Sequence, residues 1–342
     1  MNRRTFLGVA AGLTLADAGA QTPPSMPIID THIHLFDPSR PGGVPWPSAN
    51  NPAHKVMYMP SLPSRYRKVV DGLGIVGAIE IECSPLLEDN QWVLDVAQAD
   101  DIMVGTIGHL TPGTPEFRPS LERFHKNPLF RGIRHGLGGR PGGRGGRGGR
   151  GGQEGQAPPA VPAAPEGHEV DRPEFVADLK ALADADLVMD TANPSVPLLE
   201  GVVRVSDKVP NLRIVIDHLP QMWPTEAERP AYDACMKAIK DRPQIYTKVS
   251  EVLRKKEDGT IPTDLAFYKH RIDEIVDVFG MDRVLYGSDW PNGDQWLPVP
   301  VGFKIVQEYF MGKGRVAAEK YFWRNSTKAY KWVKRTARQR QA

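Results

Sequence analysis

The chain is poor in cysteine, with only Cys83 and Cys235 among its 342 residues. This excludes a framework of disulfide bonds of the kind that holds small secreted domains together. Cys83 falls at the end of an expected strand and Cys235 within an expected helix. We therefore expect two buried thiols rather than a disulfide pair.

Neither sign of charge dominates, since 43 Lys and Arg residues face 41 Asp and Glu residues, for a net charge of +2. A dedicated nucleic-acid binder usually carries a strongly basic face, so this balance argues against that class. Long apolar runs are also missing, and no stretch is apolar enough to span a bilayer. These absences favour a single large enzyme without a stable membrane anchor.

The N-terminus carries a pattern typical of a twin-arginine export signal. Residues 2–7 read Asn-Arg-Arg-Thr-Phe-Leu, and a mildly apolar run follows over residues 8–16. Residues 18–20, Ala-Gly-Ala, supply the small side chains of a cleavage site. We expect residues 1–20 to be a signal peptide read by the twin-arginine translocase, and residues 21–342 to reach the periplasm.

Apolar strands and amphipathic helices alternate along the mature chain. The expected strands cover residues 28–34, 76–83, 102–110, 130–135, 187–191, 212–218, 244–250 and 283–290. Helical periodicity covers residues 64–73, 88–100, 120–126, 173–185, 196–209, 230–241, 264–279 and most of 301–333. This α/β alternation predicts a (β/α)8 TIM barrel. A doubly wound open sheet is the alternative, but it would keep the first and last strands apart.

One segment does not fit the barrel core. Residues 136–168 contain a Gly/Arg repeat over residues 140–152, followed by a tract rich in Ala and Pro. Such a composition buries too little apolar surface to offset the entropy of ordering. We expect a disordered insertion after the fourth strand. A role in nucleic-acid binding would rest on this repeat alone.

Polar residues gather at the C-terminal ends of the expected strands, where a parallel barrel carries its active site. His32 and His34 end the first strand and share one face of it. Asp289 ends the eighth strand, which a closed barrel places beside the first. The other strand ends supply Glu82, His109, Arg134, His135, Asp190, His218, Lys248, Ser250 and Glu251.

Three imidazoles and a carboxylate, from His32, His34, His218 and Asp289, suit two kinds of site. They can hold one zinc or manganese ion with a position open for water or substrate. Without a metal, the histidines would polarise a carbonyl, Arg134 would clamp a carboxylate and Asp289 would activate water. The residues alone leave both mechanisms open. In either one we predict Asp289 and His218 as catalytic residues, and as substrate-binding residues Glu82, Arg134, His135 and Lys248.

Several stretches together resemble the amidohydrolase-2 family of the amidohydrolase superfamily. They are residues 30–37 with the Pro-Trp-Pro of 45–47, and residues 130–135, 216–219 and 286–291. The most similar branch contains sugar lactonases and 2-pyrone-4,6-dicarboxylate lactonase, and the resemblance covers nearly the whole mature chain. It implies a TIM-like barrel, hydrolysis of a lactone or related carboxyl ester, and a site built by His32, His34, His218 and Asp289. Members of this branch differ in whether they need a divalent metal.

Nonoxidative decarboxylation, found in the same wider family, is the alternative activity. Those decarboxylases usually show Glu-x-His or Ala-x-His on the first strand, whereas this chain has His32-Ile33-His34. That difference favours an anionic lactone as the small-molecule substrate. A barrel that had lost its chemistry would lack one of the four core residues, and all four are present.

Overall fold

The computed structural model describes residues 26–137 and 169–342, so the expected signal peptide and nearly all of the expected insertion lie outside the described residues. Eight strands form one sheet whose spatial order follows the chain, and every hydrogen-bonded pair is parallel. The strands are β1 (Ile28–Ile33), β2 (Ile75–Ile81), β3 (Met103–Gly108), β4 (Phe130–His135), β5 (Val188–Thr191), β6 (Arg213–Ile216), β7 (Ile245–Lys248) and β8 (Val284–Leu285).

The segment that follows β8 closes the sheet against β1. The amide of Thr31 donates to the carbonyl of Tyr286 at 3.0 Å, and the amide of His34 donates to the carbonyl of Trp290 at 2.8 Å. This closure confirms the predicted (β/α)8 barrel and the predicted adjacency of its first and last strands. β8 is shorter than expected and ends at Leu285, and Asp289 further along has a φ of +59°.

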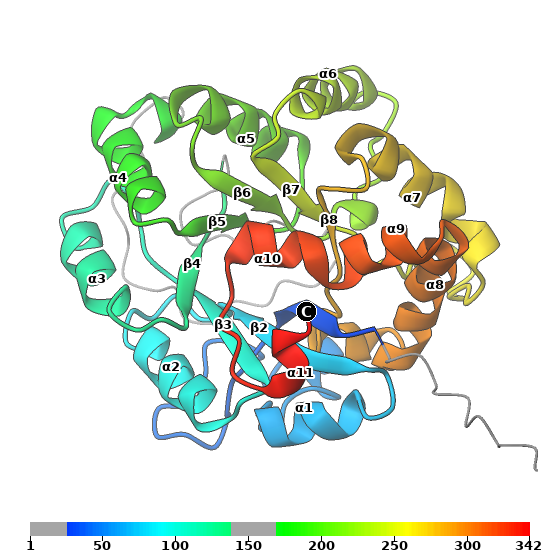
Figure 1. Ribbon diagram of the computed structural model, residues 1–342, viewed down its shortest axis with the longest axis horizontal. Helices are drawn as coiled ribbons and strands as arrows, with labels where there is room; N and C mark the ends of the chain where they lie inside the picture. The colour runs from blue at the N-terminus through cyan, green and yellow to red at the C-terminus, as the bar shows by residue number, and fades with distance from the viewer. Residues whose placement is uncertain (1–25, 138–168) are drawn as a thin grey trace, which may run out of the picture.

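Helices surround the barrel on its outer side, and the last of them, near the C-terminus, cross one of its ends (Figure 1). They are α1 (Pro63–Val69), α2 (Asp89–Ala99), α3 (Phe117–Phe124), α4 (Pro173–Asp184), α5 (Val196–Lys208), α6 (Arg229–Lys240), α7 (Leu265–Phe279), α8 (Val299–Gly312), α9 (Arg315–Glu319), α10 (Asn325–Tyr330) and α11 (Ala337–Arg340). Local sequence sets several of their starts. Pro63 and Pro173 take the first helical position, where the missing amide is no loss. Asp264 accepts from the amide of Phe267 at 3.1 Å and caps α7.

Apolar side chains fill both faces of the strands. Ile29, Val104 and Leu285 belong to a cluster inside the barrel, and a larger cluster packs the strands against the helices. Parallel strands buried on both faces are apolar almost throughout. This pattern makes the polar side chains at the strand ends stand out in the sequence.

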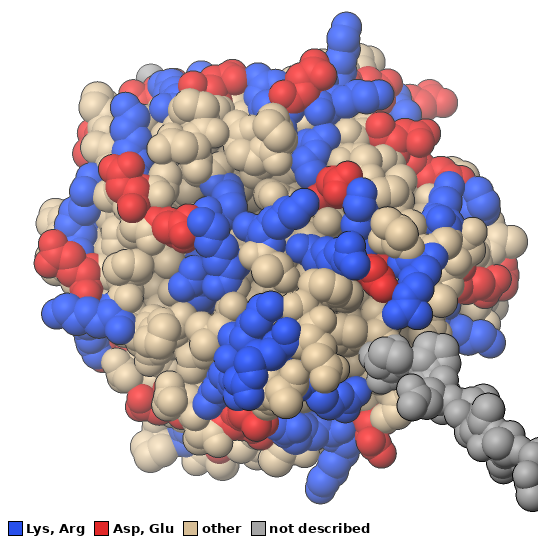
Figure 2. All heavy atoms as spheres, in the orientation of Figure 1, with Lys and Arg blue, Asp and Glu red and all other residues tan. Residues whose placement is uncertain are grey.

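The C-terminal segment covers the end of the barrel where the strands begin (Figure 1). Tyr330 is fully buried, and its hydroxyl donates to Asp190 inside the barrel at 2.8 Å. Lys and Arg side chains gather on this face (Figure 2). Arg335 caps α2 here by donating to the carbonyls of Ala97 and Gln98, each at 2.7 Å. This end of the barrel is therefore closed, and the opposite end carries the site.

The composition led to expectations about the two cysteines and about membrane-spanning helices. Cys83 and Cys235 form no disulfide with each other, and both are buried, as predicted. Among the described helices, none is both long enough and apolar enough to cross a membrane.

Candidate active site

His32, His34, His218 and Asp289 converge at the C-terminal end of the barrel strands, and all four are buried. Their common point is the Oδ1 atom of Asp289. It lies 3.4 Å from Nε2 of His32, 3.1 Å from Nε2 of His34 and 3.6 Å from Nε2 of His218. Residues that are far apart in the chain therefore form one compact cluster, as predicted from their positions at the ends of the expected strands.

The backbone around this cluster is specialised. His218 and Asp289 have φ values of +50° and +59°, in the left-handed region that residues with a side chain rarely adopt. Such conformations concentrate at functional sites. A Cβ atom on Gly287 would lie 2.8 Å from the Cβ of His32, so only glycine lets the two strands approach here. Asp30 fixes the same junction, because its carboxylate accepts from the amides of Ser288 and His32.

The second ring nitrogen of each histidine has its own partner. Nδ1 of His34 lies 2.7 Å from the carbonyl oxygen of Ile81, and Nδ1 of His218 lies 2.8 Å from Oγ of Ser250. Nδ1 of His32 lies 3.1 Å from Nζ of Lys248. These contacts orient the three rings so that every Nε2 atom faces Asp289. Histidine ligands of metals are usually held in this way.

The convergent atoms fit a divalent cation. Nε2 of His32 and Oδ1 of Asp289 are buried without a hydrogen-bond partner in the described part of the chain. The separations of 3.1 to 3.6 Å are close to the spacing of about 3.3 Å between ligands of one tetrahedral ion with bonds of about 2.0 Å. The ligand atoms of His32, His218 and Asp289 all lie within 4.8 Å of one another. His34 adds a third nitrogen, 3.1 Å from Oδ1 of Asp289, as a fourth candidate ligand atom.

The protonation states also suit metal binding and base catalysis. Burial lowers the pKa of His218 to about 4 and that of His32 well below its ordinary value, and the charge of Lys248 lowers the latter further. Burial alone would raise the pKa of Asp289, but the neighbouring imidazoles of His218, His34 and His32 bring it well below the ordinary value. At neutral pH the site thus offers neutral imidazoles at His32 and His218, and a carboxylate.

Lys248 belongs to a buried charge network behind His32. Its Nζ atom lies 2.6 Å from Oδ2 of Asp190 and 2.9 Å from Oδ1 of Asp217, and all three side chains are fully buried. Burial raises the pKa of Asp190 to about 7. At Asp217 the charge of Lys248 outweighs the effect of burial, and the pKa of Asp217 is lowered. Lys248 was predicted to bind substrate; its Nζ atom lies between these carboxylates and His32, and its role toward a substrate stays a prediction. Through its contact with Nδ1 of His32, Lys248 also holds that ring in place within the cluster.

The three other predicted substrate-binding residues lie in different places. Arg134 is beside the cluster, with Nη2 at 3.3 Å from Oδ2 of Asp217 and the side chain 13% exposed. His135 is on the other face of β4, where its ring lies 5.4 Å from that of Phe175 in α4. Glu82 follows β2 and lines a pocket beside α2. Their roles toward a substrate stay predictions.

Two supporting residues were not predicted from the sequence. Asp217 bridges Lys248 and Arg134, and its only signal was its place next to His218 at a strand end. Asn292 donates to Oδ2 of Asp289 and to Oε1 of Glu251. That contact holds the second oxygen of Asp289 and leaves Oδ1 to the histidines. Asn292 lies in a short turn after the last strand, and no motif marked it.

Comparison with known proteins agrees with this geometry. The amidohydrolase family model Amidohydro_2 matches residues 29–332. An L-fucono-1,5-lactonase of Burkholderia ambifaria is 23% identical over 263 residues, which cover 77% of this chain and 80% of the relative. The crystal structure of an amidohydrolase from Burkholderia multivorans with bound zinc superposes with a TM-score of 0.71 at 17% identity, covering 89% of this chain and 99% of that one. A probable 2-pyrone-4,6-dicarboxylic acid hydrolase from Acinetobacter baumannii superposes with a TM-score of 0.64 at 16% identity, with coverages of 89% and 99%. The chain belongs to the Amidohydro_2 family of amidohydrolases.

Proposed function

We propose that this amidohydrolase opens a lactone ring, or cleaves a related carboxyl ester, by attack of water. The observation that carries the proposal is the convergence of three imidazole Nε2 atoms on Oδ1 of Asp289, which has no hydrogen-bond partner within the described chain. The lactonase relative from Burkholderia ambifaria supports the choice of substrate class.

The metal ligands in this proposal are His32, His34, His218 and Asp289, around one zinc or manganese ion. A bound divalent ion supplies a water of lowered pKa and polarises the carbonyl that the water attacks. The zinc-containing structural neighbour supports this assignment. The supporting contacts of Ser250, Ile81 and Lys248 keep the three rings in place for it.

The residues themselves move the proton. Asp289 accepts a proton from the attacking water as the water oxygen bonds to the carbonyl carbon. The bond from that carbon to the ring oxygen then breaks, and the ring oxygen takes up the proton that Asp289 held. Arg134 is partly exposed beside the cluster, and its guanidinium suits a carboxylate on the substrate. An anionic lactone is therefore the substrate class that we propose.

We also propose that the protein works in the periplasm after export by the twin-arginine translocase. The support is the sequence of residues 2–7 with the small residues 18–20. This route carries folded proteins, so a metal site can be loaded before export.

A lactone panel tests the activity. Purified protein loaded with zinc or with manganese is mixed with sugar-acid lactones, including L-fucono-1,5-lactone, and with 2-pyrone-4,6-dicarboxylate, in weak buffer with a pH indicator. Ring opening releases a carboxylic acid, so we expect acidification with at least one anionic lactone. Carbon dioxide release from hydroxybenzoates, without acidification by any lactone, would instead establish the decarboxylase alternative.

A further inference from the structure

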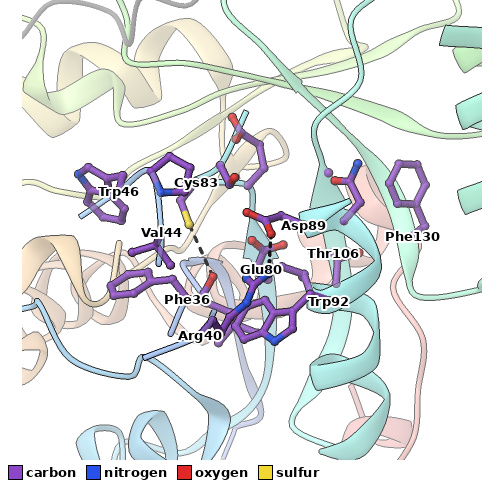
Figure 3. A pocket seen from close by; sticks show the side chains of 17 residues that line it. Phe36, Arg40, Val44, Trp46, Glu80, Cys83, Asp89, Trp92, Thr106 and Phe130 are labelled. Carbon is purple, nitrogen blue, oxygen red and sulfur yellow. Dashed lines mark hydrogen bonds and ion pairs between the residues drawn. The ribbon is translucent and has the colours of Figure 1, made fainter. Parts of the chain in front are cut away.

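A separate pocket lies outside the barrel wall, between β2 and β3 on one side and α2 on the other. It encloses about 450 Å³ of empty space, part of which is open to solvent. The strands contribute Glu80, Thr106 and Phe130, and Trp92 stands on α2. The loop after β1 closes the pocket with Phe36, Arg40 and Trp46 (Figure 3). His32, His218 and Asp289 are not among its lining residues.

A buried acid lies at the centre of this pocket. Glu80 is only 1% exposed, and its Oε1 atom has no hydrogen-bond partner among the described residues. Figure 3 shows its carboxyl group close to that of Asp89. Burial raises the pKa of Glu80 well above its ordinary value, and the charges of Glu82 and Asp89 raise it further. Native proteins rarely leave a buried polar group without a partner, because its desolvation is then uncompensated.

The rest of the pocket already shows how it holds a cation. The guanidinium of Arg40 lies 4.2 Å from the centroid of the Trp92 ring and 2.7 Å from Oδ1 of Asp89. Aromatic faces attract cations in this way. Arg40 is matched by Asp89, however, and Arg134, whose charge lowers the pKa of Glu80, is not among the lining residues. The lining thus combines aromatic walls with a buried acid whose Oε1 atom has no hydrogen-bond partner among the described residues.

We propose that this pocket binds a small organic cation, an ammonium group on an apolar body. The ammonium contacts the carboxyl group of Glu80, which releases its proton to solvent as the cation binds, and the apolar body packs against the aromatic walls formed by Phe36, Trp92 and Phe130. The pocket borders the active site at Trp46, whose ring lies 5.4 Å from that of His34. It is therefore a second binding site, and it does not depend on the proposed hydrolysis.

Isothermal titration calorimetry with benzylammonium chloride tests the proposal on the full chain. Benzyl alcohol and benzoate serve as neutral and anionic probes of nearly the same shape. We expect saturable binding of one benzylammonium, with benzyl alcohol and benzoate at least tenfold weaker. Glu80→Gln should weaken benzylammonium binding at least tenfold. Glu122→Gln, which changes an exposed acid on α3, should leave binding unchanged.

Two further variants keep the test decisive. Val44→Trp adds bulk at a partly exposed lining residue and should abolish binding without touching the buried acid, even if Glu80→Gln fails to fold. Asp289→Asn should bind benzylammonium like the wild type. No saturable binding to the wild type, equal affinity in the Val44→Trp protein, or loss of binding in Asp289→Asn would each overturn the proposal.

Discussion

Nε2 of His34 lies 3.1 Å from Oδ1 of Asp289, while its Nδ1 lies 2.7 Å from the carbonyl oxygen of Ile81. A carbonyl oxygen only accepts hydrogen bonds, so Nδ1 carries the proton of the neutral ring. Two lone pairs then face each other, one on Nε2 and one on the carboxylate. Such a pair needs a cation, either a proton or a metal ion. This relationship ties the metal site and the proton-transfer step to the same atom of Asp289.

Replacing Lys248 by Met should destabilise the protein strongly. The change leaves Asp190 and Asp217 buried without their shared cation, and breaking a buried ion pair costs about 3–5 kcal/mol of unfolding free energy. Urea denaturation measures it. Lys269→Met is the matched control, because Lys269 pairs with Asp273 on the surface and is 55% exposed, where a pair contributes about 0–1 kcal/mol. Equal losses in the two variants would refute the supporting role of Lys248.

Gly287→Ala should displace His32 and reduce both stability and metal content. The added Cβ would lie 2.8 Å from the Cβ of His32, on a rigid strand that cannot easily give way. Overpacking of this kind costs about 1–3 kcal/mol. Gly312→Ala, at a helix position with nothing within 4 Å, is the control and should be neutral or slightly stabilising. Zinc content and melting temperature check both, and a Gly287→Ala protein with full zinc content would contradict the close fit.

The unfolding free energy of the metal-free protein should depend on pH through His218. Its pKa is about 4 in the folded state against an ordinary value of 6.5, so the unfolded chain binds the proton more readily between these values. The unfolding free energy is therefore unaffected by the titration of His218 above pH 6.5, and it decreases as the pH falls from 6.5 toward 4. Asp190, with its pKa raised to about 7, acts in the opposite direction. Comparing the unfolding free energies of the wild type and His218→Gln isolates the effect of the histidine. A difference between them that stays constant from pH 6.5 to pH 4 would count against a buried neutral ring at His218.

Changing Arg3 and Arg4 to Lys should keep the precursor in the cytoplasm. The expectation rests on the twin-arginine pattern of residues 2–7. Cell fractionation with an antibody against the mature protein measures the distribution. Undiminished delivery of the Lys-Lys precursor to the periplasm would rule out this export route.

The cluster itself could be predicted because each member follows an apolar strand. His32 lies in β1 and His34 directly follows it, and Asp289 had to lie beside them once the strands closed into a barrel. The barrel followed from the alternation of apolar strands and helices. The early end of β8 at Leu285 was missed because the sequence of residues 283–290 continues the apolar pattern past it. The barrel and the strand-end positions of the site residues depend on local periodicity, which can be recognised in the sequence alone.

The supporting residues could not be assigned in the same way. Lys248 stands at the end of β7, just as the other polar candidates stand at the ends of their strands. Its partners depend on which strands lie across the barrel from β7. Tyr330 reaches Asp190 from the C-terminal segment that covers the far end, and Asn292 contacts Asp289 from a turn. Such contacts depend on three-dimensional packing rather than on any pattern along the chain.

The proton-transfer role of Asp289 is the central claim. Its most direct test is the turnover number of Asp289→Asn, at equal zinc content, on a lactone that the wild type opens. Asparagine keeps the shape and can still coordinate an ion but cannot accept the proton, so turnover should fall by about a hundredfold to ten-thousandfold with the melting temperature little changed. Turnover of Asp289→Asn within a few-fold of the wild type would contradict the account.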